Sequence, residues 1–169
     1  MSELRTNRIV PRDGLPASAS GGGIIQVVHA STQTGQSQSF STNSFADTGL
    51  SASITPKFST SKILVTGYLS YYVTIGGVGS AEWNFAVCDG SNNILDSTSA
   101  DAQGYRFNQY YVLGGKHPIN FLHSPSTTSS FTYKMRMNAK SANQSGSLVC
   151  QRNGTANNIS RLTLMEVSA

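Results

Sequence analysis

The strongest constraint on the fold is a two-residue alternation of apolar side chains between Lys62 and Ile75. The apolar members share one parity: Ile63, Val65, Leu69, Tyr71, Val73 and Ile75. The polar Thr66, Ser70 and Thr74 take the other parity. Because successive side chains of a strand point to opposite faces, this alternation predicts a long strand with one buried face. Gly67 inside the run predicts either a bulge or a close approach by another backbone.

Shorter segments repeat the same alternation along the chain. Trp83, Phe85 and Val87 alternate, and the polar turn at 89–93 after them predicts a hairpin into residues 94–95. Further strands are expected at 24–28, near Phe40, and at 50–55, 105–113, 118–122, 131–137, 148–151 and 159–167. About ten short strands at this spacing predict an all-β fold, an antiparallel β-sandwich of jelly-roll type.

The composition supports strands over helices. Ser, Thr and Asn fill 53 of the 169 positions, whereas charged residues make up only 12%. The polar groups of Ser, Thr and Asn compete for the backbone hydrogen bonds of a helix, so long helices are not expected. The length is that of one domain.

The first 23 residues differ from the rest of the chain. They contain Pro11, Pro16 and three consecutive glycines at 21–23, and too few apolar residues for a core of their own. We therefore predict an extended anchoring arm at 1–23 that docks on a partner, followed by a head domain at 24–169. The residues expected to anchor the arm are Leu4, Arg5, Arg8, Ile9, Val10, Arg12 and Leu15.

Charge and hydropathy exclude several functional classes. The net charge is +4, but the lysines and arginines are scattered, which argues against a nucleic-acid groove. No stretch is long and apolar enough for membrane insertion, and the start of the chain lacks the apolar core of a secretory signal. We therefore expect synthesis in a cytoplasm and reduced Cys88 and Cys150. A third hypothesis, an extracellular lectin of host origin, is weakened by the missing leader.

No catalytic motif is complete. No serine lies in a GxSxG elbow, and the Gly114-Gly115-Lys116-His117 segment lacks the first glycine and the final Ser or Thr of a phosphate-binding loop. The eight carboxylates fall mostly in turns, and no local pattern pairs two of them. We expect a protein that is not an enzyme and that uses no cofactor.

Two histidines offer a weak metal hypothesis. His117 and His123 are six positions apart, so an unbroken strand would place both on one face. One of them from each subunit could hold an ion at a three-fold axis. The alternative is two hydrogen-bonded histidines at strand ends, and the spacing indicates no third ligand.

Tyrosines are the best candidates for an interface. Tyr suits surfaces that are both apolar and hydrogen-bonding, such as subunit interfaces and carbohydrate platforms. Parity places Tyr68 and Tyr72 on the face opposite the buried one, and Tyr110 and Tyr111 lie beside another predicted strand. These four tyrosines are the predicted interface residues.

Several segments resemble small virion proteins of tailed bacteriophages, especially those of marine and cyanobacterial phages. The residues that carry the resemblance are the segments at 4–16, 21–28, 45–56, 59–65 and 162–166. The resemblance implies a virion protein, a fibre or capsid-decoration component, with an arm that anchors on the particle and a trimeric β-sandwich head. It implies assembly with itself and other virion proteins, without catalysis or a cofactor. The rival hypothesis is a carbohydrate-binding or glycan-depolymerising module that acts on host-surface glycans.

Overall fold

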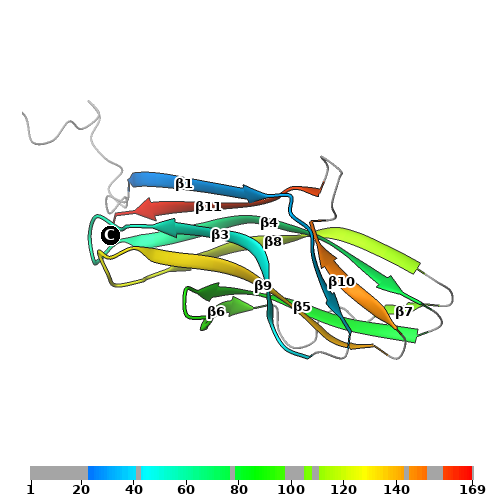
Figure 1. Cartoon of the computed structure of the whole chain (residues 1–169). Coiled ribbons are helices and arrows are strands. Elements are labelled where there is room, and N and C mark those ends of the chain that lie inside the picture. Colours follow the sequence, from blue (N-terminus) through cyan, green and yellow to red (C-terminus); the bar gives the residue numbers. More distant parts are fainter. Residues whose placement is uncertain are drawn as a thin grey trace, which may run out of the picture.

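The computed structural model describes residues 23–40, 43–76, 79–97, 105–107, 111–142, 145–151 and 158–168. These residues form eleven strands that are arranged as two facing antiparallel sheets, which confirms the predicted all-β sandwich (Figure 1). Within the described ranges, no helix is long and apolar enough to cross a membrane.

The larger sheet has six strands, and its centre is the predicted alternating strand. It contains β1 (Ile24–Thr32), β11 (Ser160–Val167), β4 (Lys62–Ile75), β10 (Gly146–Cys150), β2 (Gln36–Ser39) and β8 (Tyr111–His123). One edge of β4 pairs first with β11 and then with β10, while its other edge pairs with β8 along its length. The first strand β1 pairs only with β11.

The smaller sheet has five strands. It contains β3 (Ala46–Ile54), β9 (Phe131–Ala142), β5 (Gly79–Asp89), β6 (Ile94–Ser97) and β7 (Tyr105–Phe107). Its order is β3-β9-β5, and both β6 and β7 pair with the free edge of β5. The predicted β5–β6 hairpin is confirmed, and the Asp89 carboxylate closes its turn by accepting hydrogen bonds from the backbone amides of Ser91 and Asn93.

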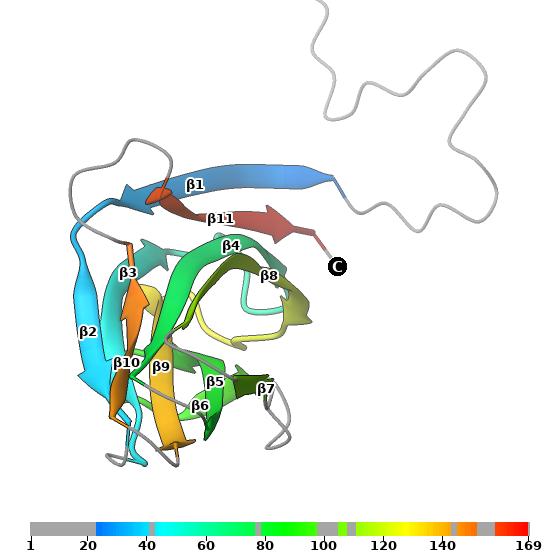
Figure 2. The same cartoon turned by 90° about the vertical axis from the view of Figure 1, so that its right-hand side faces the viewer.

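The core lies between the two sheets (Figure 2). The large side chains that it buries completely come from both: Trp83, Tyr133, Leu50, Ile54, Ile63, Leu69, Ile75, Met135, Met137, Leu148, Leu162 and Leu164. The alternating residues of β4 that were predicted to be buried face this core, and so do those of β9. Cys88 and Cys150 are buried free thiols, and burial raises the pKa of each.

The segment around Pro118 corrects one prediction. The sequence predicted two strands, at 105–113 and 118–122, but β8 runs unbroken from Tyr111 to His123 through the proline. Proline has no N–H to donate, so a sheet tolerates it at an edge. Because β4 is the only described strand that pairs with β8, β8 is such an edge strand.

Gly67 lies where β4 and β11 approach each other closely. It pairs with Leu162, and its φ is 155°, a conformation that L side chains rarely adopt. A Cβ atom at this position would lie 2.1 Å from the carbonyl oxygen of Arg161. The close backbone approach predicted from the sequence is therefore confirmed, and only glycine fits here.

A buried carboxylate closes one end of the sandwich. Glu166 on β11 is fully buried, and its side chain accepts hydrogen bonds from the Gln26 amide at 2.6 Å and the Lys57 backbone N–H at 2.7 Å. Burial alone would raise the pKa of Glu166, but the hydrogen bonds from Gln26 and the backbone outweigh it and lower that pKa. This side chain therefore joins β1, β11 and the loop after β3.

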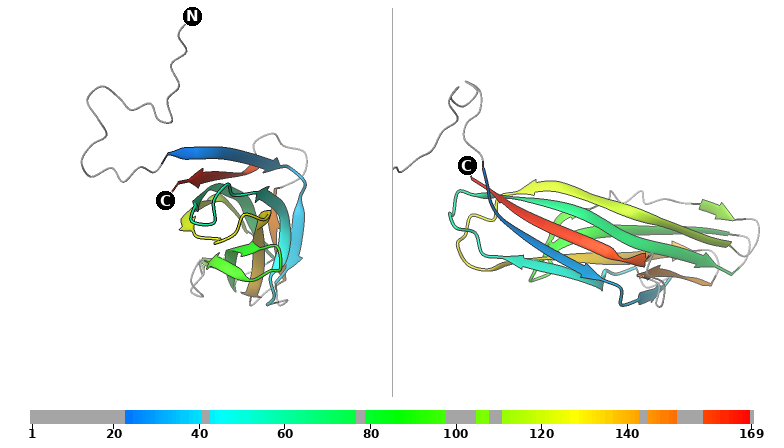
Figure 3. Two further views of the ribbon diagram at one scale, coloured as in Figure 1. Left: turned by 90° about the vertical axis from the view of Figure 1, so that its left-hand side faces the viewer. Right: turned by 90° about the horizontal axis from the view of Figure 1, so that it is seen from above.

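The start of β1 and the end of the chain lie side by side (Figure 3). The Gly23 N–H donates to the Ser168 hydroxyl, and the Ser168 N–H donates to the Gly23 carbonyl, both at 3.0 Å. Residues 1–22, which hold the predicted anchoring side chains, lie outside the described residues. The described part of the chain therefore begins at an edge strand of the larger sheet.

Candidate assembly surface

The two candidate metal ligands lie on one face of β8, and this face is turned toward the interior. The His117 ring packs on Phe85 with the centroids 4.9 Å apart, and the His123 Nδ1 atom lies 2.9 Å from the Tyr133 hydroxyl. A site on a three-fold axis needs side chains that point out of the subunit, whereas these two point inward. Among the described side chains, no three His, Cys, Asp or Glu residues are grouped to hold an ion.

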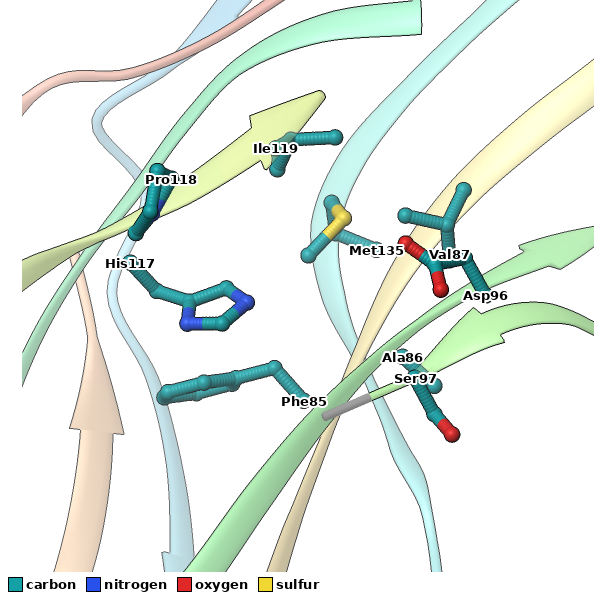
Figure 4. Close-up of a pocket in the computed structure, with 9 residues that line it drawn as sticks. All are labelled: Phe85, Ala86, Val87, Asp96, Ser97, His117, Pro118, Ile119 and Met135. Carbon is teal, nitrogen blue, oxygen red and sulfur yellow. The ribbon is translucent and has the colours of Figure 1, made fainter. Parts of the chain in front are cut away.

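A small cavity opens between the two sheets beside His117 (Figure 4). Its lining includes Phe85, Asp96, His117 and Met135, and its volume is about 20 Å³. A cavity of this size has room for about one water molecule, so it cannot hold a sugar ring. Burial lowers the pKa of His117, and the negative charge of Asp96 opposes this effect.

His123 and Tyr133 form a polar contact inside the sandwich. Tyr133 is fully buried on β9, and burial raises the pKa of its hydroxyl. Burial also lowers the pKa of His123, with a smaller opposing effect from Asp89. The neutral forms of both groups are therefore favoured, which suits a hydrogen bond that links the two sheets.

We expect Tyr133→Phe to lower the free energy of unfolding by about 1 kcal/mol, because it removes one buried hydrogen bond without changing the packed ring. Urea unfolding of the purified protein measures this loss. Tyr68→Phe is the matched control, since Tyr68 lies on the outer face of the larger sheet, and it should change stability by less than about 0.5 kcal/mol. Equal losses in the two variants would contradict a specific role for the contact with His123.

The outer face of the larger sheet carries an apolar row across four strands. The register pairs Val27 with Met165, Met165 with Leu64, and Leu64 with Leu122. Val27 is 56% exposed and Leu122 is 54% exposed, whereas Met165 and Leu64 between them are half-buried. Neighbouring residues on one face of a sheet are in contact distance, so these four form a continuous surface, called here the apolar row.

The apolar row is bordered by polar residues on one side. A polar row follows it along the strands, formed by His29, Thr163, Thr66 and Asn120 in the same register. On its other side, Ile24 and Ile25 extend the exposed apolar surface to the point where the chain enters the head. Exposed apolar surface that is contiguous and bordered by polar residues marks an interaction site more often than a scattered apolar residue does.

The predicted interface tyrosines flank this region. Tyr68 and Tyr72 lie half-buried on the same outer face of β4, as parity predicted. The Lys116 ammonium lies 4.5 Å from the centre of the Tyr68 ring, and Arg161 pairs with Tyr68 from the other side. Tyr110 lies outside the described residues, and only the backbone of Tyr111 is described.

The two sheets differ in how their charged side chains are arranged. Within the described side chains, the outer face of the larger sheet carries three charged groups, all of them cations: Lys62, Lys116 and Arg161. Three cations of the smaller sheet form ion pairs. Arg136 and Lys134 pair with Asp47, and Lys140 pairs with Glu82.

The β5–β6 hairpin carries Asp89 and Asp96, with Ile94 between them 54% exposed. This group is called here the acidic hairpin. Sequence reasoning placed Asp89 and Ile94 in a hairpin, but it did not single out the acidic character of that hairpin or the apolar row. Leu64 could have indicated the row, because it has the same parity in β4 as Tyr68, which the alternation places on the outer face.

Comparisons with known proteins concern the fold alone. No protein-family model matches the sequence, and no curated protein matches it. Similar solved structures include that of the infectious bursal disease virus Gt strain, with a TM-score of 0.43 and 12% identity over 94% of this chain and 44% of that chain. The VP2 subviral particle of the same virus gives a TM-score of 0.40 and 14% identity, over 94% of this chain and 43% of that chain. The T=1 particles derived from the same virus give a TM-score of 0.42 and 13% identity, over 98% of this chain and 41% of that chain.

This chain therefore spans less than half the length of these viral structures. The resemblance of the sequence to small virion proteins of tailed bacteriophages stays a prediction.

Proposed function

We propose that this chain is a non-catalytic structural protein of a bacteriophage virion, an appendage or capsid-decoration component. Residues 1–23 anchor it to the particle, and the β-sandwich forms a trimeric head. The apolar row carries this proposal, because a face with Val27 and Leu122 each more than half exposed is stabilised when another protein surface covers it. The row also lies where the chain enters the head, next to Ile24 and Ile25.

The interior supports the same function. The cavity beside His117 has the size of one water molecule, and the histidines of β8 are packed against Phe85 and Tyr133. This cavity is therefore too small for a ligand larger than water, whereas the exposed apolar side chains of the row lie on the outside of the sandwich. A protein of this kind works through shape and surface chemistry, without a cofactor.

A second candidate function is binding of host-surface glycans. It rests on Tyr68, which lies on the outer face with Lys116 above its ring. An aromatic ring beside a cation can stack on a sugar and attract an acidic substituent. A glycan array with the isolated head tests this function, and release of cleaved fragments would indicate the depolymerising form.

The anchoring role is tested by removing residues 2–22, so that Gly23 and its two hydrogen bonds to Ser168 are kept. We expect the truncated protein to remain folded and β-rich but to be lost from purified particles. Immunogold labelling of intact particles with an antibody to the head measures attachment and reports its location on capsid or tail. A control variant with residues 2–22 in scrambled order separates the need for this sequence from the need for length.

Two results would contradict the proposal. Particles that carry no label even with the full-length chain would exclude a virion role. A truncated protein that still labels particles at full density would exclude residues 1–23 as the anchor.

A further inference from the structure

We propose that copies of this chain associate head to tail, with the acidic hairpin of one copy docked on the apolar row of the next. The inference rests on the proposed function and specifies the contact that forms its trimeric head. The occupant of the apolar row is then a second copy of the chain, and the residue that enters it is Ile94.

Ile94 and the apolar row have matching chemistry. Ile94 is 54% exposed at the start of β6, and the row offers Val27, Leu64 and Leu122 on the outer face of the larger sheet. Burial of exposed aliphatic side chains contributes roughly 25 cal/mol for each Å² removed from water. One exposed aliphatic residue on a hairpin is thus a suitable anchor for an exposed aliphatic strip.

The charges around the two surfaces are opposite. Asp89 and Asp96 belong to the same hairpin as Ile94, and Asp96 also reaches the cavity beside His117, whereas Lys62 lies beside the apolar row and Arg161 and Lys116 lie further along the same face. Complementary potentials favour docking and select its orientation. Docking would bring carboxylates against cations that no described acidic side chain on that face neutralises.

The same charges argue against a symmetric contact. If two copies met through the apolar row, each Lys62 and Arg161 would approach cations of the other copy, because this face has no described exposed acid. Like charges placed together across an interface cost affinity. A contact between two acidic hairpins would place carboxylates against carboxylates, which also repel. A contact between the acidic hairpin of one copy and the apolar row of the next avoids both kinds of repulsion.

The positions of the two surfaces require separate copies. β1 and β11 lie on one side of the molecule and the β5–β6 hairpin lies on the opposite side, as the two perpendicular views show (Figures 1 and 2). A copy therefore cannot dock its own hairpin on its own row. Contacts between two different surfaces generate a ring when the rotation from one copy to the next closes, and an open filament when it does not. The proposed trimer requires closure after three copies, and a mass that keeps growing with protein concentration would overturn it.

The test uses two variants of the full chain, each with one damaged surface. Val27→Ser/Leu122→Ser removes the exposed apolar side chains of the row, and Ile94→Ser/Asp96→Lys removes the anchor and places a cation against Lys62. All four substituted side chains are exposed, so folding should be kept, and circular dichroism checks it. Asn120→Ser, two residues from Leu122 on the same face, is the control.

We expect light scattering to give three times the monomer mass for the native chain and the control, and the monomer mass for each variant alone. An equimolar mixture of the two variants should form a one-to-one dimer, because one intact hairpin then meets one intact row. If the Ile94→Ser/Asp96→Lys variant still has three times the monomer mass, the inference is overturned. It is also overturned if the mixture of the two variants stays monomeric. Neither result bears on the virion role, which is tested separately by immunogold labelling of particles. Failure of the head-to-tail contact can therefore be distinguished from failure of the proposed function.

Discussion

Gly67→Ala is expected to lower the free energy of unfolding by about 3 kcal/mol or more, through overpacking and backbone strain at one position. The added methyl group would lie 2.1 Å from the Arg161 carbonyl oxygen, which belongs to the backbone of β11 and cannot rotate away. The φ of 155° adds strain for any residue with a Cβ atom. Urea unfolding followed by circular dichroism measures the loss.

Gly114→Ala is the matched control for this change. Gly114 lies on β8 and pairs with the same strand, β4, but a Cβ atom there would meet Tyr71 and Tyr72 at 3.5 Å and 3.6 Å, which is ordinary contact. We expect it to change stability by less than about 1 kcal/mol. Similar losses at the two positions would show that the contact between Gly67 and β11 is not as close as described.

Glu166→Gln is expected to cost about 2–3 kcal/mol, because the carboxylate is fully buried and accepts several N–H groups. A glutamine at this position presents one oxygen and one NH₂ group, so at least one donor from Gln26 or the backbone loses its acceptor. Thermal unfolding at neutral pH measures the effect. Glu82→Gln is the control, since Glu82 is a partly exposed residue in a surface ion pair with Lys140.

The same carboxylate makes stability depend on acid pH. The pKa of Glu166 is lower in the folded chain than its ordinary value of 4.5, so the folded state favours the charged form. Its contribution is fully present above pH 4.5 and is lost as the pH falls through the lowered folded value. The native chain should therefore lose more stability below pH 4.5 than Glu166→Gln does. Parallel pH curves for the two proteins would contradict this assignment.

Sequence patterns predicted the strands where one face is buried and the other is wet. In β4 the apolar residues alternate on both sides of Gly67, in β9 they alternate from Phe131 to Met137, and the structure buries Val65, Val73 and Met135 as expected. Parity also placed Tyr68 on the outer face. These features depend on neighbours two residues apart, which the sequence displays directly.

Other features depend on residues that are far apart in the sequence. The apolar row joins Val27, Leu64, Leu122 and Met165 from four strands, and only the register of β1, β11, β4 and β8 brings them together. Pro118 lies inside β8 and does not begin a separate strand, because β8 is an edge strand, and the sequence alone does not show which strands lie at an edge. Glu166 was not recognised as buried, since its partners come from a distant strand and loop.

The pairing of β1 with β11 has a mechanical consequence. Gly23 and Ser168 lie at the same end of an antiparallel ladder that runs from Ile24 to Thr32. A pull on residue 23 along the strand axis would load the rungs of this ladder together, in shear, because the hydrogen bonds are perpendicular to the force. A pull that separated residues 23 and 168 sideways would instead break the rungs one after another. A head held by its leading segment would thus resist drag along β1 far better than a force that peels β1 away.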